Sequence, residues 1–90
     1  MDRPELIQDI KVFMLAELKL RRTPDEVKSD APLFGPDGLG IDSLDALQLG
    51  LAAEERYGVK IPLDTDPKLA EQALASVEAL ADFVIRAKAT

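Results

Sequence analysis

Apolar residues recur at steps of three and four along the first part of this chain, and this spacing constrains the fold more than any other feature. Within residues 5–20 they are Leu6, Ile7, Ile10, Phe13, Met14 and Leu18. Residues at such steps share one face of a helix. Pro4 suits a first helical turn, and the basic residues Lys19, Arg21 and Arg22 suit a last turn, where positive charge complements the helix dipole. The pattern predicts an amphipathic helix over residues 5–20.

Capping and turn signals divide the rest of the chain. "TPDE" at Thr23 to Glu26 has the form of a capping box and predicts a short helical turn. The following connection, about 28–41, contains "APLFGPDGLGI", whose three glycines and two prolines exclude a regular element. Four apolar residues within it are expected to anchor it as an ordered loop: Leu33, Phe34, Leu39 and Ile41.

Three further helices are predicted. The second runs from Ser43 to Tyr57 and stops at Gly58, a natural C-terminal cap. "VKIPL" then reads as an extended connector, because its proline disfavours a sheet strand. A short third helix starts after Asp66, and Ser76 caps a fourth. The predicted fold is all-α: a single domain over 1–90, folded as a four-helix bundle with a short third helix and a long ordered loop between helices one and two.

The composition excludes several classes of function. Only four residues are aromatic, so the core must be aliphatic, which suits packed helices. The chain has no cysteine and no histidine, so disulfides, thiolate sites and the commonest general base and metal ligand are absent. No metal site and no enzymatic activity are expected. Neither a signal peptide nor an apolar run of the roughly 20 residues that span a bilayer is present, so we expect a cytoplasmic protein.

The net charge of -6 is concentrated in the middle of the chain. Residues 25–55 hold eight acids and a single base, Lys28. Such a segment disfavours nucleic acid and anionic membranes and favours a partner with a basic patch. The alternative, that the charge only keeps a small protein in solution, stays open.

The predicted helix 43–57 has two apolar faces. The first is a core stripe of mostly small residues: Ala46, Leu49, Gly50, Ala53 and Tyr57. The second consists of Leu44, Leu47 and Leu51. Polar and acidic residues border the second face: Asp42, Asp45, Gln48, Glu54 and Glu55. Because unpaired carboxylates are costly to bury, an exposed docking surface is favoured, with burial of both faces as the alternative.

Ser43 stands at the start of this helix, where either it or Asp42 could be the N-cap. It is not a plausible nucleophile, because no histidine is available to activate its hydroxyl. An exposed hydroxyl after a glycine-rich loop instead suits modification by another enzyme. A phosphate attached there would meet the positive end of the helix.

The stretch "LGIDSLDALQL" resembles the modification motif of acyl carrier proteins. The resemblance extends through the first helix, the long loop, the acidic second helix, the "YGVKIP" connector and the final helix beginning "SVEAL". It implies that Ser43 carries a covalent 4'-phosphopantetheine arm, transferred from coenzyme A by a phosphopantetheinyl transferase. The thiol of that arm would hold acyl intermediates as thioesters. Asp42 would help to position the transferase and its magnesium.

The same resemblance implies a partner-binding surface for acyl-transferring, ketosynthase-type or ligase enzymes with basic docking patches. Its residues are Leu44, Asp45, Leu47, Gln48, Leu51, Glu54 and Glu55. Acids would steer the encounter and leucines would supply the desolvated contact. The implied protein is a stand-alone, monomeric acyl carrier protein. From the charge and the apolar runs, we expect no nucleic-acid partner and no membrane span.

Some features depart from the family pattern. Gln48 stands where many members have an acid, Arg56 adds a base to the acidic helix, and the loop before Asp42 is long. These departures favour a specialised fatty acid or polyketide pathway. Gly50, unusual inside a helix, suggests room between helices for part of an acyl chain. A peptidyl or D-alanyl carrier, and an unmodified helical interaction adaptor, are the alternatives.

Overall fold

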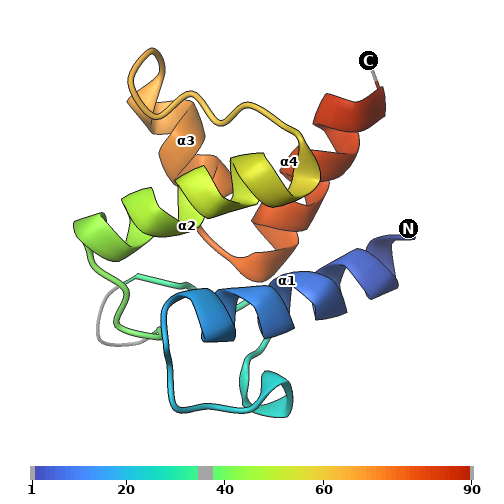
Figure 1. Cartoon of the computed structure of the whole chain (residues 1–90), viewed down its shortest axis with the longest axis vertical. Helices are drawn as coiled ribbons and strands as arrows, with labels where there is room; N and C mark the ends of the chain where they lie inside the picture. Colours follow the sequence, from blue (N-terminus) through green and yellow to red (C-terminus); the bar gives the residue numbers. More distant parts are fainter. Residues whose placement is uncertain (1, 35–37, 90) are drawn as a thin grey trace.

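The computed structural model describes residues 2–34 and 38–89. Its elements in chain order are α1 (Arg3–Glu17), the 3-10 turn η1 (Pro24–Glu26), α2 (Ser43–Tyr57), α3 (Pro67–Ala73) and α4 (Val77–Ala89). Figure 1 shows α1 and α2 side by side in opposite directions, with α4 packed on α1 and passing behind the end of α2, and with α3 beyond α2. Within the described residues, β pairing is limited to an isolated bridge between Phe34 and Ile41. The predicted all-α fold, with four helices and a short third one, is confirmed.

The first helix begins and ends earlier than the spacing of its apolar residues predicts, at Arg3 and Glu17. Asp2 caps its start, where the side-chain carboxylate accepts the Glu5 backbone N–H at 2.9 Å. The helix ends at Glu17, before the predicted end at Leu20, and its last turn holds no basic residue. The prediction that the basic run 19–22 complements the dipole from within the last turn is therefore wrong.

A left-handed residue causes this early end. Lys19 has a φ of +54°, which no further helical turn can accommodate. The Leu20 N–H returns to the Leu15 carbonyl at 2.9 Å, and the Lys19 N–H reaches the Ala16 carbonyl at 3.3 Å. These two bonds form a Schellman cap, and the apolar pair Leu15 and Leu20 is placed where such caps bring side chains together.

The loop after η1 is ordered in its described part. η1 itself begins with the predicted capping box, in which the Thr23 N–H donates to the Glu26 carboxylate at 2.8 Å. The Leu33 N–H donates to the Ala75 carbonyl, between α3 and α4, at 3.0 Å. The four predicted anchors are buried or half-buried: Leu33, Phe34, Leu39 and Ile41. Residues 35–37 of this predicted loop lie outside the described residues.

The predicted caps hold the remaining helices. α2 ends at Gly58, whose φ is +67°, a left-handed conformation that glycine adopts without steric cost. The Asp66 carboxylate accepts the Leu69 N–H at 3.2 Å at the start of α3. The Ser76 hydroxyl accepts the Ala79 N–H at 3.0 Å at the start of α4. The segment between α2 and α3 is a connector without strand structure, as predicted.

The core is aliphatic and lies where α1, α2 and α4 meet. Its fully buried larger side chains are Ile10, Met14, Leu33, Leu49, Leu74, Leu80 and Val77. α2 contributes through the first of its two faces, because Leu49, Gly50 and Ala53 are buried. The orientation of α2 is thus set by this face, which leaves its opposite side available.

Candidate functional site

Ser43 is the first residue of α2, and its side chain is exposed. Asp42, not Ser43, is the N-cap: its carboxylate accepts the Asp45 N–H at 2.9 Å. The Asp45 carboxylate reaches back to the Asp42 N–H at 3.5 Å, which completes a capping box. Within the described part of the chain the Ser43 hydroxyl has no hydrogen-bond partner. The structure therefore separates the two roles that the sequence left open, and the serine hydroxyl is available for chemistry.

The position of Ser43 also favours a phosphate on its oxygen. The first backbone N–H groups of a helix have no partners within the helix and carry the positive end of the helix dipole. A phosphodiester on the Ser43 oxygen would lie beside this end of a 15-residue helix. The residues present thus fit attachment of a phosphate-linked group.

A groove opens beside Ser43 between α2 and α3. It has a volume of about 610 Å³. Its apolar walls include Phe34, Ala46, Leu47, Leu63, Ala70 and Leu74. The carboxylates of Asp64 and Glu71 also border it. A flexible group tethered to Ser43 has a largely apolar surface within reach.

The second face of α2 is exposed. The exposed fractions of Leu44, Leu47 and Leu51 are 76%, 45% and 52%. The alternative in which both faces of α2 are buried is therefore excluded. An exposed apolar patch of this kind is typical of a surface that partners bind, but the role of these three leucines in binding stays a prediction.

Two of the polar residues beside these leucines are engaged within the protein. The Glu54 carboxylate accepts the backbone N–H of Ile61 at 2.7 Å and so ties the connector to α2. The Gln48 side-chain amide donates to the Glu17 carbonyl at 3.0 Å, at the end of α1. Glu55 is exposed. The sequence predicted all three as partner-binding residues. It contained no signal for the contact of Gln48 with the distant Glu17, or for that of Glu54 with Ile61, seven residues later in the connector.

Arg56 does not add a free positive charge to α2. Its guanidinium donates to the two Asp9 carboxylate oxygens at 3.0 Å and 2.8 Å. The Tyr57 hydroxyl donates to the same carboxylate at 2.7 Å. The hydrogen bond from Arg56 is the largest cause that lowers the pKa of Asp9. Burial and the hydrogen bond to Asp9 raise the pKa of Tyr57.

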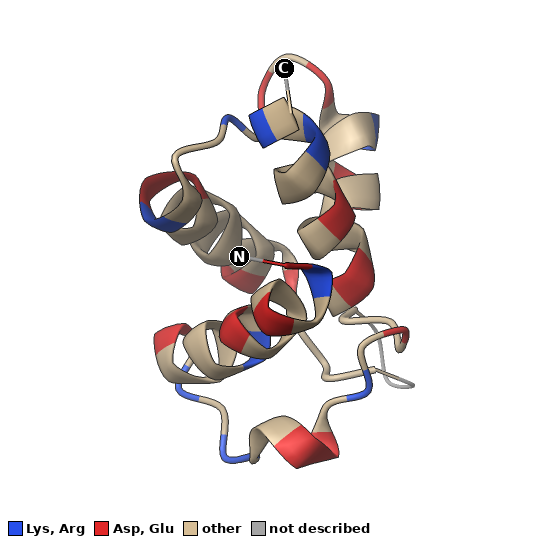
Figure 2. Ribbon diagram, turned by 90° about the vertical axis from the view of Figure 1, so that its right-hand side faces the viewer, with Lys and Arg blue, Asp and Glu red and all other residues tan. Residues whose placement is uncertain are grey.

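Figure 2 shows that the basic residues lie mainly near helix ends and in connections.

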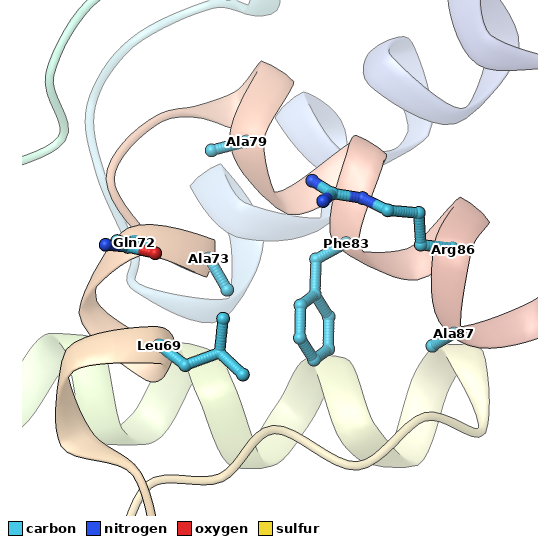
Figure 3. A pocket seen from close by; sticks show the side chains of 7 residues that line it. All are labelled: Leu69, Gln72, Ala73, Ala79, Phe83, Arg86 and Ala87. Carbon is cyan, nitrogen blue, oxygen red and sulfur yellow. The ribbon is translucent and has the colours of Figure 1, made fainter.

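Further grooves lie beyond the one at Ser43. One, between α3 and α4, places Leu69 and Phe83 opposite one another, with Arg86 at its edge (Figure 3). A further groove, beside the connector, is lined by Leu51 and Leu63, and it shares Leu69 and Phe83 with the groove between α3 and α4.

Among the described residues, no group of three or more acidic side chains could hold a metal ion. No described helix combines the length and apolar character needed to cross a membrane.

Comparison with protein families shows which family the chain belongs to. The family model described as "Phosphopantetheine attachment site" matches residues 11–84. The chain belongs to this phosphopantetheine-binding family. The family implies a 4'-phosphopantetheine prosthetic group, and the acyl carrier proteins within it are non-catalytic carriers.

Similar proteins support the same assignment to the acyl carrier proteins. The chain is 39% identical over 59 residues to the acyl carrier protein of Sulfurovum sp. (strain NBC37-1), covering 66% of this chain and 73% of the relative. It is 34% identical over 65 residues to that of Campylobacter hominis, covering 72% of this chain and 77% of the relative. It is 32% identical over 84 residues to that of Thermosynechococcus vestitus, covering 93% of each chain. The predicted family is confirmed.

Proposed function

We propose that Ser43 carries the 4'-phosphopantetheine arm and that this protein holds acyl intermediates as thioesters on the arm's thiol. One observation carries the proposal: the Ser43 hydroxyl is exposed at the start of α2, while Asp42 performs the capping. The hydroxyl is thus free to be modified without loss of a helix cap. Because the chain has no cysteine, its own side chains offer no thiol for a thioester.

The attachment step is a transfer between oxygen atoms. The Ser43 oxygen forms a bond to the phosphorus of the phosphopantetheine unit of coenzyme A. The bond from that phosphorus to the nucleotide bisphosphate breaks, and the serine proton passes to the transferase. The protein contributes an accessible oxygen, the N–H groups at the start of α2, and Asp42, which by the family resemblance helps to position the transferase and its magnesium.

The exposed face of α2 is the proposed docking surface. Leu44, Leu47 and Leu51 provide apolar contact area, and Asp45 and Glu55 provide negative charge that attracts a basic patch. Gln48 and Glu54 lie beside this face and support it from within the protein through their contacts with α1 and the connector. Proposed partners are the phosphopantetheinyl transferase and acyl-transferring, ketosynthase-type or ligase enzymes.

For the pathway, we propose specialised fatty acid or polyketide synthesis. Support comes from Gln48, whose side-chain amide binds the end of α1 where many family members have an acid, and from Gly50, whose missing side chain leaves room for the Leu63 side chain beside the groove at Ser43. A peptidyl or D-alanyl carrier would share the fold and differ in cargo, whereas the family match disfavours an unmodified adaptor. A single carrier domain over 1–90, a monomeric state and a cytoplasmic location remain predictions from the sequence.

Intact-mass measurement tests the attachment site. The protein is incubated with coenzyme A, magnesium and a promiscuous phosphopantetheinyl transferase, and we expect a gain of one phosphopantetheine. Ser43→Ala should show no gain, whereas Ser29→Ala, which removes a hydroxyl far along the chain from the motif, should load like the wild type. Failure of the wild type to gain mass, under conditions that load a control carrier, would refute the proposal.

A further inference from the structure

We propose that Leu63, on the connector between α2 and α3, is a displaceable plug that sets how long an acyl chain the protein can bury. The inference rests on the proposed attachment of acyl groups at Ser43. It assigns a specificity-determining role to a residue outside the motif and outside the exposed face of α2. Three structural observations support it.

The first observation is the contact between Leu63 and Gly50. Gly50 is buried in the middle of α2. A Cβ atom at this position would lie 3.3 Å and 3.4 Å from the two terminal methyl carbons of Leu63, and 3.5 Å from a methyl carbon of Leu74. The space that a helix side chain would fill is therefore filled by a side chain from the connector. A Cβ atom at position 50 would be fixed to the helix backbone, whereas the Leu63 side chain has other rotamers to adopt.

The second observation is that Leu63 borders two grooves. It lines the groove of about 610 Å³ that contains Ser43. It also lines the groove of about 530 Å³ that contains Leu51, Leu69 and Phe83. The same side chain is thus a wall of both spaces, so its displacement would join them into one longer apolar channel beside α2.

The third observation is how the connector is held. Ile61 is buried, and its N–H is bound by the Glu54 carboxylate at 2.7 Å. Leu63 itself is only half-buried, and its N–H bonds locally to the Ile61 carbonyl at 2.8 Å. Ile61 therefore anchors the connector, while the side chain two residues later can move without breaking that anchor.

These features predict a response that depends on chain length. A short acyl chain on the arm occupies the groove beside Ser43 and leaves Leu63 in place. A longer chain displaces Leu63 and continues toward Leu69 and Phe83, whose side chains face one another in Figure 3. Each buried methylene stabilises the loaded protein by about 0.8 kcal/mol, roughly a fourfold change in an equilibrium constant.

The test uses the wild-type protein loaded with saturated acyl chains from acetyl to palmitoyl, with loading verified by intact mass. Leu63 methyl groups are observed by NMR with selective labelling. We expect their resonances to stay unchanged with the shortest chains, to shift with the longer ones, and to show contacts with the acyl protons. Leu63 resonances that are identical for acetyl and palmitoyl forms would overturn the proposal.

Two variants sharpen the test through the melting temperature of each loaded form. Leu63→Ala removes the plug, so the gain in Tm from a long chain over a short one should exceed that of the wild type. Leu18→Ala, a half-buried leucine that lines neither of these grooves, should lower Tm overall but keep the wild-type dependence on length. Equal length dependence in all three proteins would refute the role of Leu63. Absence of any mass gain would instead refute the attachment at Ser43.

Discussion

Arg56 on α2 and Asp9 on α1 form a two-point ion pair, with donor–acceptor distances of 3.0 Å and 2.8 Å. Beside it, the Tyr57 ring meets the Phe13 ring edge-on, with centroids 5.9 Å apart. The pair joins the end of α2 to α1 and neutralises the positive charge of Arg56. The exposed leucine face of α2 is consequently left with acidic neighbours and no competing free cation from Arg56.

Asp9→Asn should weaken the fold at neutral pH by about 1 kcal/mol, the scale of a partly exposed charged hydrogen bond. It should also flatten the loss of stability in acid. The bond from Arg56 holds the pKa of Asp9 below its ordinary 3.8. A lowered folded-state pKa gives stability that is complete above the unfolded value and lost as the pH falls through the folded value. Urea unfolding at neutral pH and at pH ~3 measures both effects.

The control for this prediction is Asp82→Asn. Arg3 likewise lowers the pKa of Asp82, but the Asp82 side chain is 43% exposed, against 24% for Asp9. Its replacement should change the acid profile less, because solvent screens the pair. Parallel pH profiles for the wild type and Asp9→Asn would contradict the assignment to this pair.

Lys19→Gly should raise the free energy of unfolding by roughly 1 kcal/mol. Lys19 adopts a φ of +54° after α1, a conformation that is strained for residues with a Cβ atom. Lys19→Ala keeps the Cβ and should bring no such gain, although it removes the same charge. Chemical denaturation of the three proteins distinguishes backbone strain from charge, and equal stabilities of the two variants would show that strain is not the cause.

Gly58→Ala should have the opposite effect and destabilise the protein by roughly 1 kcal/mol. Gly58 ends α2 with a φ of +67°. Among the described residues, a Cβ there would meet just the Lys88 ammonium nitrogen, at an ordinary contact distance of 3.5 Å, so the loss of stability arises from the backbone and not from crowding. Gly58→Asn should lose less stability than Gly58→Ala, since asparagine tolerates this left-handed conformation better than alanine. Thermal unfolding provides the measurement, and an alanine variant as stable as the wild type would contradict it.

Leu44→Ala and Leu49→Ala, on the same helix, should separate docking from folding. Leu49 is 1% exposed, and its truncation should cost about 3 kcal/mol of stability. Leu44 is 76% exposed, and its truncation should change stability by no more than about 0.5 kcal/mol. Leu44→Ala should nevertheless lower kcat/KM for loading by the transferase. Loading at the wild-type rate would remove Leu44 from the proposed docking surface.

The positions of the helices could be predicted from local signals. Asp42 and Ser43, Gly58, and Ser76 mark helix ends by residue type, and the structure places the ends of α2 and the start of α4 there. The end of α1 was missed because Lys19, a residue that seldom adopts a positive φ, takes the left-handed position usually occupied by glycine. No signal in the neighbouring residues marks that conformation.

The two faces of α2 could likewise be read from a period of 3.6 residues, because the rotation per residue along a helix is constant. The contacts of the polar residues of α2 could not be predicted from this period. Gln48 binds Glu17 across 31 positions, and Arg56 binds Asp9 across 47.

Leu63 fills the space at Gly50, and this contact likewise depends on how separate segments of the chain pack. Local spacing determines which side of a helix a residue occupies, whereas a bond between distant segments depends on how the helices pack. Packing is the collective result of the whole core. The grouping of Ser43 with its neighbouring leucines on one side of α2 therefore followed from the order of the residues. Their exposure, and the partners of Glu54, Gln48 and Arg56, followed only from the folded chain.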